Sequence, residues 1–176
     1  VHIIEGTREE TTQAAIAYYT ERGLVYASHN LSPYFIEGTR TLAYEVTRQF
    51  ADGLPDHVVM PVGNGSLFIG AWKGLEELRN AGQVSQMPRF HCIQARAVMP
   101  IAAAYSGDNW TPEAGARTVA GGISVAAPPR KQQIMNVLRA SKGTALAVEE
   151  KEILRWQKLL AEEEGIFAEP TSAAAF

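Results

Sequence analysis

Apolar and polar positions along the chain follow two spacings, one typical of buried strands and the other of amphipathic helices. Apolar runs of strand length at His57–Val62 and Arg89–Ala95 predict strands of a parallel sheet, buried on both faces. Shorter apolar runs at Val1–Ile4, Leu24–Ala27 and Thr144–Val148 predict further strands. The segments between these runs change to a spacing of three and four residues, which is typical of helices.

This second spacing predicts helices at Thr7–Arg22, Thr39–Phe50, Leu67–Leu78, Met99–Ala104, Arg130–Arg139 and Glu149–Glu163. Thr7 and Glu10 have the spacing of a capping box at the start of the first helix. Ser28–Glu37 is expected to form a loop. Because strands alternate with helices, we predict an α/β fold, a three-layer sandwich whose mostly parallel sheet carries helices on both faces. We expect one such domain over residues 1–176.

Composition narrows the class of protein. Of the 176 residues, 46% are hydrophobic and 20% are charged, which is typical of a folded globular protein. The net charge of −3 gives no basic footprint for nucleic acid, and no apolar stretch is long enough to cross a membrane. The single cysteine, Cys92, fits a reducing compartment, so we expect a cytoplasmic protein. Four dispersed histidines lack the spacing of metal ligands, and we expect His57 and His91 to be structural.

The most informative segment is the glycine-rich run Pro61–Leu67, between a predicted strand and a predicted helix. Bare N–H groups and the positive end of the helix dipole meet at such a turn, and glycines let a phosphate approach the backbone. The run is not a Walker A element, because no Lys-Ser/Thr pair follows. It also departs from a dinucleotide fingerprint, since Phe68 occupies the third glycine position. Spacing alone leaves both a phosphate loop and an ordinary tight turn open.

Four segments, in one order along the chain, resemble the threonine synthases. Ser32–Thr41 resembles their Asn-Pro-x-Arg-Ile/Leu-Glu-Gly-x-Lys-Thr signature, and Pro55–Gly65 resembles their glycine-rich segment. Gln94 and Ala95 end the matching downstream strand, and Glu164–Ala174 resembles the motif Glu-Gly-Ile-Phe-x-Glu-Pro-x-Ser-Ala-Ala. The chain is therefore similar to the C-terminal, larger domain of fold type II pyridoxal-phosphate enzymes, the tryptophan synthase β-like superfamily.

The resemblance implies a cofactor, a substrate class and a set of site residues. It implies pyridoxal 5'-phosphate as cofactor, a small amino acid as substrate, and elimination or replacement at the β or γ carbon. Main-chain N–H groups in the glycine loop would hold the cofactor phosphate: Gly63, Asn64, Gly65, Ser66 and Leu67. The nearby loop offers candidate substrate contacts: His29, Asn30, Ser32 and Phe35. From charge and spacing we expect no nucleic-acid, membrane or metal partner, and the resemblance implies a homodimer of the full-length parent.

The sequence also departs from the family pattern. The lysine that binds the cofactor covalently lies upstream in the family, and no lysine here has its context, so we expect five surface lysines: Lys73, Lys131, Lys142, Lys151 and Lys158. We therefore expect a part of a longer protein, lacking the N-terminal half and the extreme C-terminus, with no catalytic residue and no activity of its own. Phe35 replaces an arginine that meets the substrate phosphate in relatives using phosphohomoserine, and Gly121 replaces an acidic residue beside the cofactor ring.

Two alternatives to a threonine synthase-like enzyme stay open. One is a threonine or serine dehydratase, for which the residue at position 35, together with the missing N-terminal half, is the discriminating feature. The other is a truncated pseudoenzyme or binding module that keeps anion binding without catalysis. Within the signature, Arg40 matches a family lysine but is expected on the helix surface, and Glu37 and Glu169 are expected to have structural roles.

Overall fold

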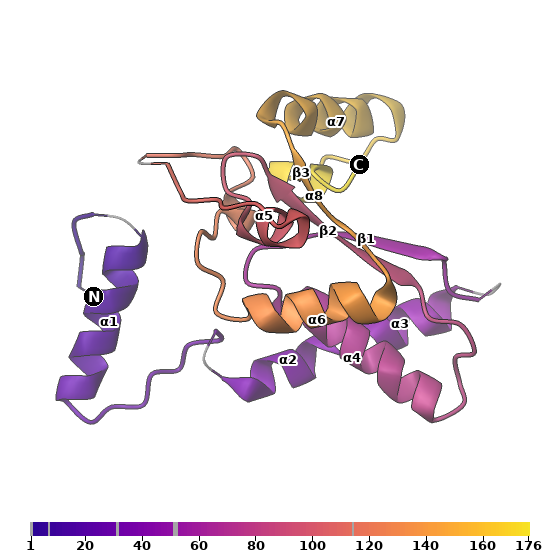
Figure 1. Cartoon of the computed structure of the whole chain (residues 1–176), viewed down its shortest axis with the longest axis horizontal. Coiled ribbons are helices and arrows are strands. Elements are labelled where there is room, and N and C mark those ends of the chain that lie inside the picture. The colour runs from indigo at the N-terminus through magenta and orange to yellow at the C-terminus, as the bar shows by residue number, and fades with distance from the viewer. Residues whose placement is uncertain (1, 7, 31, 51–52, 114) are drawn as a thin grey trace. The chain divides into compact units, whose positions relative to one another are not determined.

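The computed structural model describes residues 2–6, 8–30, 32–50, 53–113 and 115–176 (Figure 1). Its contacts divide the chain into two units, residues 1–33 and residues 34–176, which are described separately below. The sheet and the helices that cover it belong to the second unit. Whether all 176 residues form one domain therefore stays a prediction.

The first unit contains helix α1, Arg8–Glu21. The chain turns after it at Gly23, whose φ is +59°, and the N–H of Leu24 donates to the carbonyl of Tyr19 over 2.9 Å. The expected strands at 1–4 and 24–27 are wrong, because residues 2–4 and 24–27 have no regular structure. Ile3 and Val25 are 90% and 94% exposed, so neither side chain is buried as in a strand of a covered sheet. The proposed cap Thr7 and residue Val1 lie outside the described residues.

The second unit is built on a parallel sheet of three strands in the order β1-β2-β3. The strands are β1 (His57–Pro61), β2 (Arg89–Ala95) and β3 (Ala145–Val148). Met60 pairs with Cys92, and Cys92 pairs with Ala145, in parallel ladders on both sides of β2. The sequence predictions for these three strands are confirmed to within one residue, as is the parallel arrangement.

Helices cover both faces of this sheet (Figure 1). Phe90 and Cys92 of β2 pack in a core with α4 (Ser66–Asn80), α6 (Lys131–Ser141) and α5 (Pro100–Ser106). Ile93 and Ala95 point to the other face, because side chains alternate along a strand, and they pack with Ile153 of α7 (Glu150–Glu163). The short elements η1 (Gly121–Ile123) and α8 (Pro170–Ala173) complete that layer. The three-layer prediction is confirmed.

The signature segment folds differently from the prediction. Instead of a loop at 28–37 and one helix at 39–50, the chain forms α2 (Pro33–Thr39) and α3 (Thr41–Gln49), with Arg40 between them. Pro33 stands at the first helical position, where its fixed φ and missing N–H are tolerated, and Ile36 anchors the helix in the core. In the described part of the chain, no helix is both long and apolar enough to cross a membrane.

Candidate anion-binding site

The glycine-rich segment connects the end of β1 to the start of α4. The N–H of Val62 donates to the carbonyl of Ile93 over 2.9 Å, and the first helical bond runs from the N–H of Ile69 to the carbonyl of Gly65, also 2.9 Å. Between these bonds, the N–H groups of residues 63–68 have no hydrogen-bond acceptor among the described residues. The first turn of a helix directs its free N–H groups out of its N-terminus. The segment thus offers several donors at the positive end of the α4 dipole.

At two positions in this segment, the surrounding atoms leave room for glycine but not for a larger residue. A Cβ on Gly63 would lie 3.0 Å from the carbonyl oxygen of Gly122 and 3.1 Å from Cγ2 of Val125. Gly65 has a φ of +79°, and a Cβ there would lie 2.5 Å from Cδ1 of Ile134. The loop therefore requires glycine at both positions for packing, in addition to any need for a ligand to approach the backbone.

The loop belongs to the second of the segments that resemble threonine synthases, and the first and the last of these segments pack around it. From the first, Thr39 Oγ1 donates a 3.0 Å hydrogen bond to the carbonyl of Ser66, and Gly70 leaves the room for that approach. From the last, Thr171 Oγ1 accepts a 3.0 Å hydrogen bond from the N–H of Gly122, whose carbonyl faces Gly63. These contacts join residues far apart in sequence around the C-terminal end of β1, the edge at which parallel sheets bind ligands.

A buried arginine adds positive charge beside the loop. Arg130 is only 8% exposed, and its guanidinium donates to Ser66 Oγ over 3.5 Å. Burial lowers the pKa of Arg130 from its ordinary value. A guanidinium nevertheless keeps its proton in proteins, so the group carries a positive charge. Sequence reasoning missed this residue, because Arg130 lies 64 positions from Ser66 and no local motif connects them.

Arg40 and Lys73, which were expected on the surface, take part in an ion-pair network with two glutamates beside α4. Arg40 pairs with Glu37 and Glu77, and Lys73 pairs with Glu37, so α2, α3 and α4 are connected through side chains. The hydrogen bond from Lys73, with the nearby charges of Lys73 and Arg40, lowers the pKa of Glu37. Tyr44 adds a 2.8 Å hydrogen bond to Glu77. The network holds the Glu-Gly signature segment against α4 and gives Glu37 a structural role.

The two histidines that were expected to be structural lie at the other end of the strands. His57 Nδ1 and His91 Nε2 are 2.8 Å apart, and His91 Nδ1 lies 2.8 Å from Thr144 Oγ1. The two rings stack with centroids 5.1 Å apart. This hydrogen-bonded chain joins the beginnings of β1, β2 and β3. Among the described residues, no group of three or more His, Cys, Asp or Glu side chains could hold a metal ion.

The predicted substrate residues fall in different units. His29, Asn30 and Ser32 belong to the first unit, where the N–H of Asn30 donates to Ser28 Oγ (3.3 Å) and the N–H of Ser32 to the Ser28 carbonyl (3.0 Å). Phe35 belongs to the second unit, where it lies on α2 and is 42% exposed. The role of all four in substrate binding therefore stays a prediction.

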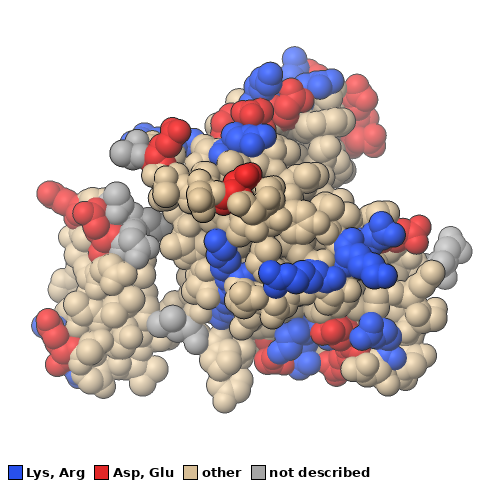
Figure 2. All heavy atoms as spheres, in the orientation of Figure 1, with Lys and Arg blue, Asp and Glu red and all other residues tan. Residues whose placement is uncertain are grey.

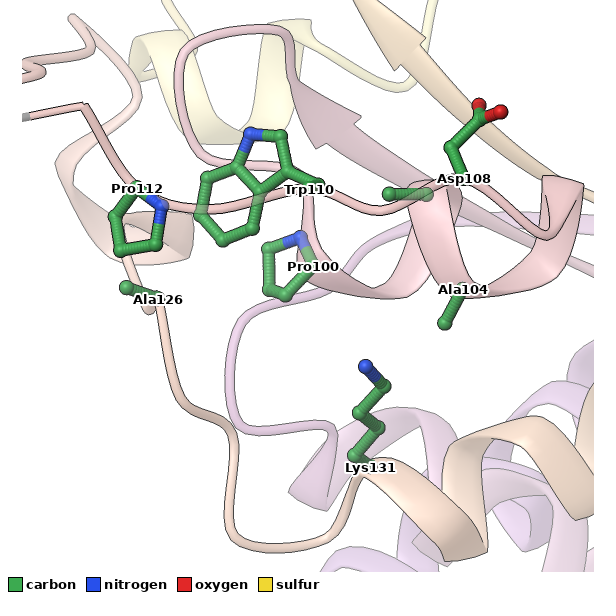
Figure 3. Close-up of a pocket in the computed structure, with 8 residues that line it drawn as sticks. Pro100, Ala104, Asp108, Trp110, Pro112, Ala126 and Lys131 are labelled. Atoms are coloured by element: carbon green, nitrogen blue, oxygen red, sulfur yellow. The ribbon is translucent and has the colours of Figure 1, made fainter.

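A separate cavity of about 140 Å³ lies between α5 and the start of α6 (Figure 3). The amine of Lys131 points into it and the Trp110 indole forms part of its wall (Figure 3). Figure 2 shows lysine and arginine side chains over α6, whereas both signs of charge mix over α7. No residue of the glycine loop lines this cavity, so it is distinct from the anion-binding loop.

Comparison with known proteins gives the family. A family model described as "Pyridoxal-phosphate dependent enzyme" matches residues 1–176, and the chain belongs to this family. Members of this family depend on pyridoxal phosphate, and the cofactor implied by the resemblance is thereby confirmed.

Threonine synthases are among the curated relatives. The chain is 34% identical over 154 residues to the threonine synthase of Methanocaldococcus jannaschii. The matched region covers 86% of this chain and 38% of that protein. It is 36% identical over 153 residues to that of Methanosarcina acetivorans, again covering 86% and 38%. The chain thus spans well under half the length of these two relatives.

Solved structures of other enzymes share the fold. Threonine deaminase isoform 2 from Solanum lycopersicum, in its processed form, superposes with a TM-score of 0.77 at 20% identity, covering 99% of this chain and 46% of that one. Maize serine racemase gives a TM-score of 0.75 at 19% identity, covering 98% and 50%. At these identities the likeness concerns the fold alone.

Proposed function

We propose that the N–H groups of residues 63–68 bind the phosphate of pyridoxal 5'-phosphate. The observation that carries this proposal is the run of six backbone donors without an acceptor in the described structure, at the start of the 15-residue helix α4. A phosphate monoester carries close to two negative charges at neutral pH and several acceptor oxygens, so it matches several such donors. Gly63 and Gly65 leave the backbone bare, and Arg130 adds a cation.

We infer that the whole protein acts on a small amino acid by elimination or replacement at the β or γ carbon, as a threonine synthase-like enzyme. When bound, the cofactor supplies an electron sink for negative charge that develops on the substrate. The residues of this chain bind and orient the phosphate, and the packing of α2 and η1 against the loop fixes its shape. None of its described side chains is assigned a proton transfer.

A threonine or serine dehydratase is the second candidate, favoured by one residue. Phe35 stands where the threonine synthase signature has an arginine, and a phenyl ring cannot make a charge-assisted hydrogen bond to a phosphate. A substrate without a phosphate would not need that arginine. The two candidates share the cofactor and the loop, and they differ in the substrate and in the reaction carried out on it.

The phosphate site is tested by placing a negative charge in it with Ser66→Asp. An acidic residue in the first turn of a helix stabilises the helix by about 0.3–1 kcal/mol, so this substitution leaves the fold intact. The carboxylate would repel the phosphate at close range. In the full-length natural protein, equilibrium dialysis should show pyridoxal phosphate binding weakened about tenfold or more.

The matched control is Gln83→Glu, which adds the same charge just beyond the opposite end of α4, at an exposed position. This variant should bind the cofactor as the wild type does. Equal affinity in the Ser66→Asp variant and the control would show that the loop is not the phosphate site.

A further inference from the structure

Gln94 is a fully buried polar side chain that contacts the glycine loop. It is the second-to-last residue of β2, and its exposed fraction is 0%. Its Nε2 donates to the carbonyl of Val62 over 3.0 Å. Its Oε1 accepts from the N–H groups of Ile101 and Ala102, over 2.8 and 3.1 Å. Because a carbonyl can only accept and an N–H can only donate, these three partners fix which way the amide faces.

The bond to Val62 determines the orientation of the first peptide of the loop. The peptide between Val62 and Gly63 is planar and trans, so its C=O and its N–H point in opposite directions. With the carbonyl held by Gln94, the N–H of Gly63 must point away from Gln94. That N–H is the first of the six donors without an acceptor in the described structure.

The same side chain also holds the start of α5. Ile101 and Ala102 lie in the first turn of this helix, where N–H groups lack helical partners. Gln94 satisfies two of them and connects them to the loop through one rigid amide. Because a buried polar group without a partner is costly, the three bonds stabilise a single arrangement of β2, α5 and the loop.

We propose that Gln94 is a positioning residue for the cofactor phosphate, acting through the Val62–Gly63 peptide to aim the N–H of Gly63 at it. This inference rests on the proposed function of the loop. A side chain that only satisfied buried groups would change stability but not the preference for a phosphorylated ligand. The preference for pyridoxal phosphate over pyridoxal, which lacks the phosphate, therefore separates the two roles.

The first variant is Gln94→Met, which keeps the length of the side chain and removes the donor. The affinities of the full-length natural protein for pyridoxal phosphate and for pyridoxal are measured by titration and expressed as a ratio. A hydrogen bond to a charged group typically corresponds to about a tenfold change in affinity or more. The ratio should fall by about that factor in the variant, mainly through weaker binding of pyridoxal phosphate.

The second variant, Gln94→Glu, is nearly isosteric and gives a pH-dependent signature. When protonated, the acid donates to the Val62 carbonyl, as the amide does; when ionised, it repels that carbonyl. Burial favours the protonated form. The ratio, normalised to the wild type at each pH, should recover as pH falls. This variant carries the test if Gln94→Met does not fold.

Leu160→Ala serves as the control, because Leu160 is buried in α7 and its loss lowers stability without touching the loop. It should leave the ratio unchanged. A wild type with no preference for the phosphorylated ligand would overturn the proposed function of the loop. A wild type with that preference, kept fully by both Gln94 variants at every pH, would overturn the role of Gln94 alone.

Discussion

The side chain of Ile134 fills the space that any side chain on residue 65 would need. An ideal Cβ on Gly65 would lie 2.5 Å from both Cγ1 and Cδ1 of Ile134, and the φ of +79° is strained for any other L-residue. A substituent at position 65 therefore points at α6 rather than at the donors of the loop. Loss of cofactor in a Gly65→Asp variant would follow from this clash, so such a variant is a poor probe of charge repulsion.

A double-mutant cycle tests the close approach of Ile134 to residue 65. Gly65→Ala should lower the free energy of unfolding by about 1–3 kcal/mol, through backbone strain and overpacking against Ile134. Ile134→Ala should remove the overpacking part, so the double variant should be more stable than the sum of the single effects predicts. Urea unfolding measures all four proteins. Strict additivity would show that Ile134 does not limit the size of residue 65.

The histidine pair predicts a pH dependence of stability. Burial, then the charge of His57 and then that of Arg89, lower the pKa of His91 below its ordinary value of 6.5. The unfolded chain therefore binds a proton at this residue more readily than the folded chain does. This contribution to stability is fully present above about pH 6.5 and is lost as pH falls below it.

The test compares urea unfolding at pH 7.5 and pH 5.5 for the wild type and for His91→Asn, which cannot titrate. The wild type should lose more stability between the two pH values than the variant. His2→Asn, at an exposed position of the first unit, is the matched control and should behave like the wild type. A variant at position 91 with the full wild-type pH dependence would contradict this account.

Arg130 predicts a charge effect on cofactor binding. Its guanidinium is buried beside Ser66, so Arg130→Met should weaken pyridoxal phosphate binding by about tenfold, and Arg130→Lys should weaken it less. Arg139→Met removes an exposed arginine from the last turn of α6, the helix that Arg130 directly precedes, and should have no effect. Binding is measured by titration of the full-length natural protein. Equal losses at positions 130 and 139 would point to a general charge effect.

Phe35 predicts the substrate. Because a phenyl ring offers phosphohomoserine no charge-assisted bond, the full-length natural protein should release phosphate from that compound poorly. Phe35→Arg should increase the release, as measured by a colorimetric phosphate assay, whereas Phe35→Leu should not. Efficient release by the wild type would overturn this reading of position 35.

The sequence predicted those features that depend on neighbouring residues. The apolar runs at 57–62 and 89–95 indicated strands because a buried parallel strand is apolar on both faces. The glycine loop could be located because a strand, a glycine turn and a helix follow one another directly. The end of the predicted loop at 28–37 could not be located in the same way. Proline is common both in loops and at the first position of a helix, so Pro33 did not reveal that a helix begins there.

The parts that the sequence did not predict depend on long-range contacts. Gln94 lies 32 positions from Val62, and Arg130 lies 64 positions from Ser66. No spacing rule connects either pair, because their proximity follows from the order of strands and helices in the folded sheet. Leu24–Ala27 failed as a strand for a related reason: an apolar run forms a strand only where a partner is available for its backbone groups.

The central claim is that the backbone N–H groups of residues 63–68 hold a phosphate. Amide signals of the ¹⁵N-labelled protein, followed by NMR while pyridoxal phosphate is added, test it most directly. The account predicts that the signals of Gly63, Gly65, Ser66 and Leu67 shift most and saturate together, with smaller shifts when pyridoxal is added instead. Saturable shifts confined to other residues, with these four signals unchanged, would contradict it.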